Sequence, residues 1–260
     1  MRGIIIAAGM GKRMHQYTKS KPKCLLSIGK KTILQWTVEG LKAAGCNDIF
    51  VITGHKGNEI SKLGYKTIEN KDYKTNNILH SLFKAKNLFD QELIVVYSDI
   101  YVEKEIFKGL ALNKKDLVLT ADKSWQEYYM DRSLHPEEQA EKIIIDNNSK
   151  ILEIGKDLII NRSKKYYEFI GLFKASEKAA VAMKNTFLMI DNKINSKDKF
   201  ERSSSWSNAY LTDFFQFIIN NNILDINVNI VSKGWAEFDT IEDYNRLNNI
   251  IKSQKLISIK

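Results

Sequence analysis

The fold is decided by Gly3-Ile4-Ile5-Ile6-Ala7-Ala8-Gly9-Met10-Gly11-Lys12-Arg13, near the start of the 260-residue chain. The apolar run from Gly3 to Ala8 predicts a strand that is buried on both faces of a parallel sheet. The glycines after it allow a tight backbone turn whose amide groups point at phosphate oxygens. Lys12 and Arg13 add positive charge where a triphosphate would lie. The stretch therefore predicts a strand that leads into a phosphate-binding loop.

This loop differs from two other glycine-rich phosphate loops. The dinucleotide fingerprint needs a third glycine three residues after Gly11, where this chain has Met14. A Walker-type loop would continue with Gly-Lys-Ser or Gly-Lys-Thr, and this one does not. A plain strand-to-helix turn would use the same glycines, so the loop alone does not establish phosphate binding.

The first half of the chain alternates strands with helices. We expect strands over residues 3–8, 48–53, 65–69, 93–97 and 117–120. Helices are expected over residues 32–44, ended by Gly45, and onward from a cap at Asn76 or Asn77. This alternation predicts right-handed βαβ units and a mainly parallel sheet.

The second half predicts shorter strands of mixed direction, over residues 142–146, 151–155 and 168–173. Helices over residues 176–187 and 209–221, a strand over 226–231 and a last helix over 241–253 complete the pattern. With two prolines and no low-complexity linker, no sharp domain boundary is visible. We expect one α/β domain over residues 1–260, Rossmann-like, with three αβα layers, a mixed but mainly parallel central sheet and an embellished C-terminal half.

The composition excludes several other classes. No apolar run approaches the roughly 20 residues of a membrane span, and the basic, apolar start is too short for a signal peptide. We therefore expect a cytoplasmic protein without a membrane partner. Cys24 and Cys46 have no zinc-ligand spacing and predict two reduced thiols. The formal charge of +9 suits a polyanion site. Because the lysines are scattered, we expect no nucleic-acid partner.

A second motif follows the loop, at Lys21-Pro22-Lys23. Proline fixes the local backbone, so Lys23 becomes a positioned charge. The combination of Ala-Ala-Gly-x-Gly-x-Arg with Lys-Pro-Lys resembles the nucleotidyltransferase family that includes sugar-phosphate nucleotidylyltransferases and phosphocholine cytidylyltransferases. The resemblance implies that residues 1–120 bind the nucleotide and 121–260 the acceptor, and that Arg13 and Lys23 are catalytic. It also implies a nucleotide-binding loop made of Ala7, Ala8, Gly9, Met10, Gly11, Lys12 and Arg13.

Three carboxylates are expected to bind a metal. Asp99 follows the strand over residues 93–97, at the carboxyl end where ligands of open α/β sheets collect. Glu237 and Asp239 are two residues apart and point the same way from an extended segment. Their stretch, Trp235-Ala236-Glu237-Phe238-Asp239-Thr240, resembles a run in cytidylyltransferase-type members. The resemblance implies that Asp99, Glu237 and Asp239 bind Mg²⁺ as the cofactor, although turn and cap roles remain alternatives.

Other stretches narrow the branch of the family. Asn76-Asn77-Ile78-Leu79-His80-Ser81-Leu82 resembles a segment of phosphocholine cytidylyltransferases, in which Asn77 and Ser81 would lie beside the base. The stretches 122–125, 132–136, 138–142 and 210–213 resemble the same branch. The resemblance implies a magnesium-dependent enzyme that transfers CMP from CTP to a small acceptor and releases pyrophosphate. A sugar-1-phosphate nucleotidylyltransferase using UTP or dTTP, and an inactive nucleotide-binding regulatory protein, are the alternatives.

The acceptor is expected to carry a phosphate or phosphonate. Phosphocholine, phosphoethanolamine and 2-aminoethylphosphonate fit the branch, while a phosphorylated amide or amino acid and a sugar phosphate stay open. A cavity for a cationic amine should combine aromatic faces with acids; the available side chains are Trp125, Tyr128, Tyr129, Glu168, Trp206 and Asp213. The acceptor oxygen is already ionised, so no general base is needed and His55 and His80 are dispensable. Monomer and homodimer are both compatible with the sequence.

Overall fold

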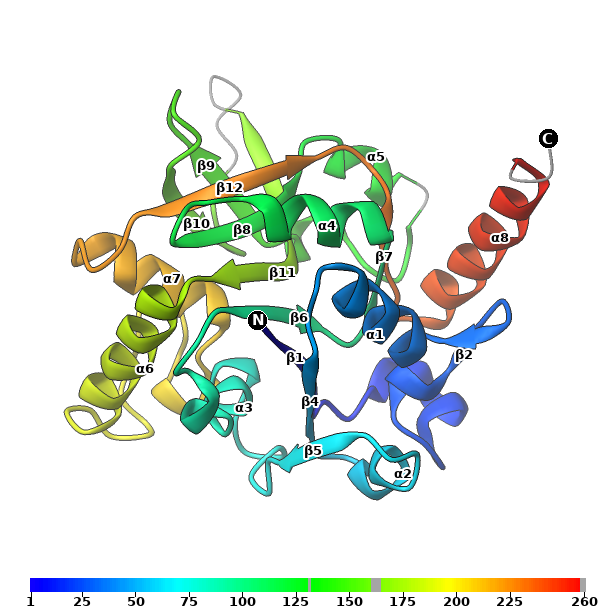
Figure 1. Ribbon diagram of the computed structural model, residues 1–260, viewed down its shortest axis with the longest axis horizontal. Helices are drawn as coiled ribbons and strands as arrows, with labels where there is room; N and C mark the ends of the chain where they lie inside the picture. Colours follow the sequence, from blue (N-terminus) through cyan, green and yellow to red (C-terminus); the bar gives the residue numbers. More distant parts are fainter. Residues whose placement is uncertain (131, 160–164, 258–260) are drawn as a thin grey trace.

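The centre of the molecule is strand β1 (Arg2–Ala7), in a computed structural model that describes residues 1–130, 132–159 and 165–257. β1 pairs in parallel with β4 (Asp48–Thr53) on one side and with β6 (Leu93–Tyr97) on the other. β5 (Lys66–Glu69) continues the parallel part beyond β4. The expected strand before the glycine loop is therefore confirmed, and it lies in the middle of the sheet (Figure 1).

The other half of the sheet is built around the long strand β11 (Tyr166–Ala175). β11 runs antiparallel to β6, to β8 (Leu117–Asp122) and to β9 (Lys142–Ile145). β12 (Ile226–Val231) extends β8 in parallel, and β10 (Ile151–Gly155) pairs antiparallel with β9. Within the described part of the chain the main sheet has nine strands. It is mixed, as expected.

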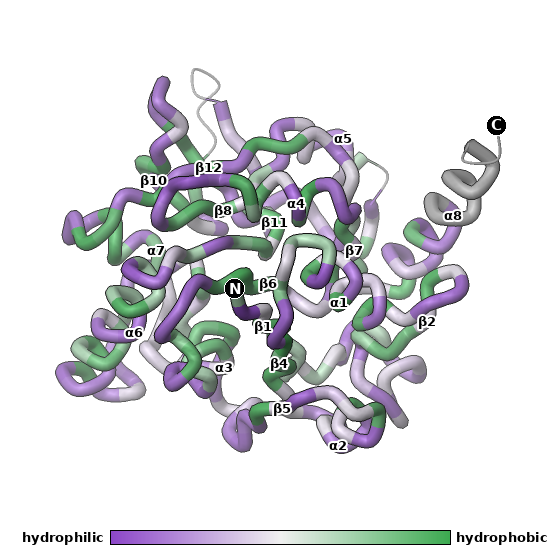
Figure 2. Tube along the Cα trace, viewed as in Figure 1, coloured by the Kyte–Doolittle hydropathy of each residue, from purple (hydrophilic) through white to green (hydrophobic). Residues whose placement is uncertain are grey.

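Helices cover both faces of this sheet. Along β1, Ile4 and Ile6 point into one hydrophobic cluster and Ile5 and Ala7 into another, as strand alternation requires. The first cluster includes α3 (Ile78–Phe83), α6 (Glu177–Asp191) and α7 (Leu211–Asn220), and the second includes α1 (Ile33–Ala43) and α4 (Lys104–Leu112). Hydrophobic residues follow the inner strands and hydrophilic ones the outer turns (Figure 2). The three-layer prediction is confirmed.

Shorter elements surround the carboxyl ends of the parallel strands. β7 (Ile100–Val102) pairs antiparallel with β13 (Trp235–Glu237), which joins two distant parts of the chain. β2 (Ser27–Ile28) and β3 (Lys31–Thr32) form a small hairpin. The 3-10 turns span Lys12–Thr18, Lys23–Leu25, Lys86–Leu88, Glu137–Gln139 and Trp206–Asn208. The remaining helices are α2 (Gly57–Ser61), α5 (Trp125–Tyr129) and α8 (Ile241–Ile257), of which α8 projects from the body (Figure 1).

The expected boundaries agree with most of these elements. β4, β6, β10 and β12 begin and end at the expected residues. α1 starts one residue later than expected, because the Thr32 side chain caps it by accepting from the Gln35 amide. The short β7 and β13 and the helices α2, α4 and α5 were not predicted. Among the described residues, no helix is both long and apolar enough to cross a bilayer.

Candidate active site

The glycine loop turns where β1 ends. Gly11 has φ +59° and ψ 35°, in the left-handed region that favours glycine. A Cβ atom at this position would lie 3.0 Å from the Thr18 methyl group. The Thr18 hydroxyl in turn donates a hydrogen bond to the Gly11 carbonyl oxygen at 3.0 Å. Close packing and backbone conformation together require glycine here.

The loop forms one wall of a cavity of about 200 Å³, which we call the nucleotide cavity. Its wall includes most of the predicted nucleotide-binding residues, namely Ala7, Ala8, Gly9, Gly11, Asn77 and Ser81. The structure does not bring Met10, Lys12 or Arg13 to this wall. The Lys12 side chain is exposed, and Arg13 lines a second cavity beside the carboxylates.

Asn77 and Ser81 also have local structural roles. The Asn77 side chain caps α3, since its Oδ1 accepts from the Ile78 amide at 2.8 Å. The buried Ser81 hydroxyl accepts from the Asn70 amide group at 2.9 Å and lies 3.2 Å from the Asn77 carbonyl oxygen, to which it donates. These bonds fix the two side chains at the cavity wall.

Lys23 lies between two of the predicted metal carboxylates. Its ammonium group donates to Asp99 Oδ2 at 2.7 Å and also to Asp239. Pro22, with φ −63° and ψ 153°, directs the chain into the turn that carries Lys23. Burial opposes the charge of Lys23, but the two carboxylates outweigh it and raise the pKa of the ammonium group. The lysine therefore remains a cation at neutral pH.

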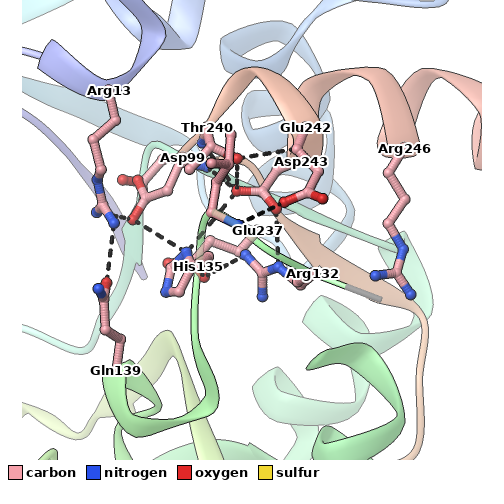
Figure 3. A network of polar contacts seen from close by, with 12 residues as sticks. Arg13, Asp99, Arg132, His135, Gln139, Glu237, Thr240, Glu242, Asp243 and Arg246 are labelled. Carbon is pink, nitrogen blue, oxygen red and sulfur yellow. Dashed lines mark hydrogen bonds and ion pairs between the residues drawn. The ribbon is translucent and has the colours of Figure 1, made fainter. Parts of the chain in front are cut away.

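Arg13 joins this cluster from the glycine loop. Its guanidinium donates to Asp239 and to Gln139 Oε1, the latter at 3.0 Å. Burial favours the neutral form of Asp239, yet Lys23 and Arg13 hold the pKa of its carboxyl well below the usual range. Asp239 is thus an anion between two cations. Figure 3 shows Arg13 and Gln139 facing each other at the edge of this network.

A buried network of ion pairs and hydrogen bonds connects Glu237 to Arg132 and Asp243. Arg132 lies between Asp243, at 2.9 Å, and Glu237, at 3.5 Å (Figure 3). Asp243 accepts from the Asp239 and Thr240 amides at 3.0 and 2.9 Å, so it fixes the turn between β13 and α8. Burial raises the pKa of Glu237 well above its ordinary value, and the nearby carboxylate of Asp239 adds to the effect.

These side chains fit a divalent cation. Ligand atoms of His135, Glu237 and Asp239 lie within 4.8 Å of one another. His135 Nδ1 is buried and has no hydrogen-bond partner among the described residues. Burial and Arg132 lower the pKa of His135 to about 4, so its ring is neutral and can act as a ligand. Asp99 is connected to the same cluster by Lys23, whose ammonium group donates to both Asp99 and Asp239. Carboxylate oxygens dominate the set, which suits a hard cation.

A second cavity, of about 160 Å³, adjoins the carboxylates, and we call it the acceptor cavity. Two predicted acceptor residues line it: Tyr129 and Glu168. The Tyr129 hydroxyl donates to Glu168 Oε1, while Glu168 Oε2 is buried without a partner among the described residues. Burial raises the pKa of Glu168 to about 8.

The other four predicted acceptor residues lie outside this wall. Trp125 is buried and donates to the Tyr166 carbonyl oxygen at 3.0 Å. Tyr128 stacks on Trp235 and donates to the Glu237 carbonyl oxygen at 2.7 Å. Both therefore support the site from behind.

Trp206 and Asp213 have structural surroundings as well. Trp206 is 2% exposed, packs in the main hydrophobic cluster and donates to Asp191 at 2.8 Å. Asp213 is buried and accepts from the Tyr210 amide at 2.9 Å and from the Ser203 hydroxyl. These contacts satisfy both side chains inside the fold, and neither faces the acceptor cavity.

The sequence analysis missed several residues of the acceptor cavity. His135, Gln139, Glu141, Lys156 and Tyr210 line it. All of these except Lys156 fall within the stretches that resemble phosphocholine cytidylyltransferases, so a signal for them existed. Lys156 follows the edge strand β10 and had no motif around it.

The fold and the site together define a nucleotidyltransferase. A glycine loop follows the central strand, and a lysine and carboxylates lie beside this loop. Residues 3–141 match the MobA-like NTP transferase domain. The chain belongs to this family.

Full-length relatives have related activities. The chain is 31% identical to CTP:phosphoglutamine cytidylyltransferase of Campylobacter jejuni, over 94% of this chain and 97% of the relative. It is 24% identical to choline-phosphate cytidylyltransferase of Streptococcus pneumoniae, over 98% and 100% of the two chains. The solved structure of the CTP:phosphocholine cytidylyltransferase of Streptococcus pneumoniae superposes with a TM-score of 0.74, at 21% identity over 96% and 98% of the chains. At this identity, the similarity to the solved structure shows a shared fold.

Proposed function

We propose that the protein transfers CMP from CTP to a small phosphate- or phosphonate-bearing acceptor and releases pyrophosphate, acting in the cytoplasm. One observation carries the proposal: Lys23 lies between Asp99 and Asp239, beside the loop that lines the nucleotide cavity. Relatives that align over nearly the whole chain and carry cytidylyltransferase names support CTP as the nucleotide. The acceptor cavity adjoins the same carboxylates.

The residues of the site perform the transfer by positioning and charge. The glycine loop holds the triphosphate through its backbone amides. Lys23 and Arg13 stabilise the negative charge that spreads over the phosphate oxygens in the transition state. The acceptor oxygen is anionic at neutral pH, so it attacks the α-phosphorus without a protein base, and pyrophosphate leaves toward the loop.

The cofactor in this proposal is Mg²⁺, held by Asp99 and Asp239 with Glu237. The convergence of His135, Glu237 and Asp239, with a His135 nitrogen that has no hydrogen-bond partner among the described residues, supports a divalent cation in this place. When bound, Mg²⁺ supplies neutralisation of phosphate charge. Lys23 also neutralises Asp99 and Asp239, which holds the two carboxylates close together.

Pyrophosphate release tests the function. Purified protein with Mg²⁺ should release pyrophosphate from CTP in the presence of phosphoglutamine, phosphocholine, phosphoethanolamine or 2-aminoethylphosphonate. UTP, dTTP, ATP and GTP serve as nucleotide controls, and glucose 1-phosphate as a sugar control. Asp99→Ala should abolish turnover. Activity only with glucose 1-phosphate and UTP or dTTP would contradict the proposal.

The two alternatives are weaker on specific grounds. The sugar-1-phosphate reaction has less support, because the relatives aligned over the whole chain are named for phosphoglutamine and choline phosphate. A catalytically inactive nucleotide-binding protein would need only the loop. The paired contacts of Lys23 with Asp99 and Asp239 favour an enzyme instead.

A further inference from the structure

The acceptor cavity contains a lysine ammonium group that no other described side chain or carbonyl group pairs by a hydrogen bond or ion pair. Lys156 lines this cavity, and its ammonium group lies 4.4 Å from the centre of the Tyr210 ring. Among the residues that the structure describes, no hydrogen bond or ion pair holds this group. Burial opposes its charge, but Glu141, Tyr210, Glu237 and Asp239 together outweigh that effect and raise the pKa of Lys156, so it stays charged.

The transfer reaction itself does not require Lys156. The phosphorus groups already have two cations at the carboxylate cluster, Arg13 and Lys23, besides the proposed metal. Arg13 is occupied there by Asp239 and Gln139. Lys156 is therefore free to bind a second anionic group of the acceptor.

The same cavity contains an acid of which one oxygen has no hydrogen-bond partner among the described residues. Glu168 is 4% exposed, and its Oε2 atom has no hydrogen-bond partner among the described residues. An N–H donor on the ligand would pair this oxygen, and a cationic donor would also favour the ionised form of the carboxyl, whose pKa burial raises to about 8. A quaternary ammonium group has no such donor, whereas a primary ammonium group has three.

The sheet brings the two unpartnered groups close together. Glu168 on β11 lies opposite Lys142 on β9, and Lys142 lies opposite Gly155 at the end of β10. Lys156 is the next residue, and its carbonyl oxygen accepts from the Lys142 ammonium at 2.8 Å. Neighbouring strands are roughly 4.8 Å apart, so Glu168 and Lys156 are separated by about two strand spacings.

We infer that the acceptor is a phosphorylated α-amino acid, with its ammonium group on Glu168 and its carboxylate on Lys156. This inference rests on the proposed function, because it names the acceptor of the same reaction. Phosphoethanolamine would leave Lys156 unpaired. Phosphocholine would leave both the Lys156 ammonium group and Glu168 Oε2 without a hydrogen-bonding partner.

Binding measurements test the inference independently of turnover. Calorimetry with Mg²⁺ and a non-hydrolysable CTP analogue compares O-phosphoserine and phosphoglutamine with phosphoethanolamine and phosphocholine. Phosphoethanolamine differs from O-phosphoserine only in lacking the carboxylate. At least one of the two amino acids should bind about tenfold or more tightly than both amines, the size expected for a charge-assisted hydrogen bond.

Lys156→Met should remove this preference and change phosphoethanolamine affinity by less than about twofold, since no carboxylate contact is lost. The matched control is Lys108→Met, an exposed lysine on α4, which should keep the wild-type preference. Equal or tighter binding of the amines by the wild type would overturn the inference. So would an equal loss for all acceptors in Lys156→Met, which would put the phosphoryl group on Lys156.

The proposed function fails in a different way. If the amino acids bind with the expected preference and no acceptor releases pyrophosphate from CTP, the transfer reaction is wrong and the amino acid site stands. If pyrophosphate is released with phosphocholine and Lys156→Met has no effect on any acceptor, the reaction stands and the amino acid site is wrong.

Discussion

Lys23 occupies the position where a cation matters most. It contacts Asp99 and Asp239, and its side chain is 12% exposed. It neutralises two carboxylates, and during transfer it is placed to neutralise phosphate oxygens. These two roles make the residue important for both local order and rate.

Lys23→Met should lower kcat by about 10²- to 10³-fold, the loss seen when one pre-organised electrostatic group is removed. The KM for CTP should change much less, because the loop still binds the triphosphate. Lys30→Met, an exposed lysine in the neighbouring hairpin turn, provides the control and should keep wild-type rates. Steady-state pyrophosphate release measures both variants. A KM effect larger than the kcat effect would assign Lys23 to ground-state binding.

Glu168 should make stability depend on pH. Its pKa is raised by burial to about 8, against 4.5 for an ordinary glutamate, so the folded chain holds this proton more tightly than the unfolded chain. The stability that the group contributes is complete below about pH 4.5 and is lost as the pH rises through about 8. Between these values the slope is at most about 1.4 kcal/mol per pH unit.

Glu168→Gln should remove this part of the slope. Urea unfolding at pH 5, 6.5 and 8 measures it, and Glu105→Gln on the exposed side of α4 should retain the wild-type slope. Identical slopes for Glu168→Gln and the wild type would mean that Glu168 titrates normally.

At the residue scale, the sequence selected four charged residues that the structure brings together. Arg13, Lys23, Asp99 and Asp239 meet in space. Asp99 and Asp239 follow the strands β6 and β13, and Arg13 and Lys23 lie in the two 3-10 turns after the glycine loop. The acceptor side was predicted less well. Aromatic residues are chosen both for packing and for binding, so the sequence alone could not separate Trp206 from Tyr129. The place of Lys156 in the cavity depends on the pairing of the edge strand β10, and no local sequence pattern identifies that pairing.

At the scale of the element, β11 depends on one glycine. Gly171 has φ +78°, and a Cβ atom there would lie 2.4 Å from the Tyr97 ring. The strand bends here: its pairing with β8 shifts between Phe169 and Phe173. β11 pairs with β9 through its first half, with β6 through its second half, and with β8 on both sides of this bend.

Gly171→Ala should destabilise the fold by about 1–3 kcal/mol, the cost of a strained backbone conformation, with the ring clash in addition. Gly109→Ala provides the matched control. Gly109 lies in α4, and nothing is within 4 Å of its added Cβ atom, so alanine should stabilise the helix by roughly 0.5–1 kcal/mol. Thermal unfolding distinguishes the two. A neutral Gly171→Ala would mean that Tyr97 can move aside and that the bend tolerates a side chain.

The sequence predicted elements according to their length and pattern. β4 and β6 are continuous apolar runs and were located to the residue. β7 and β13 have three residues each and are defined only by their mutual pairing, so no window of sequence contains their signal. α4 was missed although it has a clear apolar side, formed by Phe107 and Leu110.

At the scale of the whole molecule, ligand binding should stabilise the fold in two steps. A ligand at about 100 times its Kd adds about 2.7 kcal/mol, which corresponds to roughly 5–10 °C in Tm for a chain of this size. CTP alone should raise Tm, and CTP with Mg²⁺ should raise it further. Asp99→Asn should retain the first increase and lose the second. Differential scanning fluorimetry with Ca²⁺ and EDTA controls measures each step, and no increment from Mg²⁺ in the wild type would contradict the proposed metal.

The layered architecture followed from the sequence, but the complete sheet order did not. Parallel pairing of β1, β4 and β6 results from the alternation of strands and helices. The insertion of β11 between β6 and β8 depends on long-range contacts that alternating patterns do not encode. The acceptor cavity lies beside this inserted strand, which explains why its residues were the hardest to predict.

The short ribbon of β7 and β13 has a consequence for protein synthesis. Asp99 precedes β7 and Asp239 follows β13, and the Phe238 amide donates to the Asp99 carbonyl oxygen at 3.0 Å. On the ribosome, the glycine loop and Asp99 emerge long before Asp239 exists. A nascent chain is therefore expected to stay inactive until its last segment has been translated. Any nonsense mutation before Trp235 should give a product without transferase activity, however much of the sheet it forms.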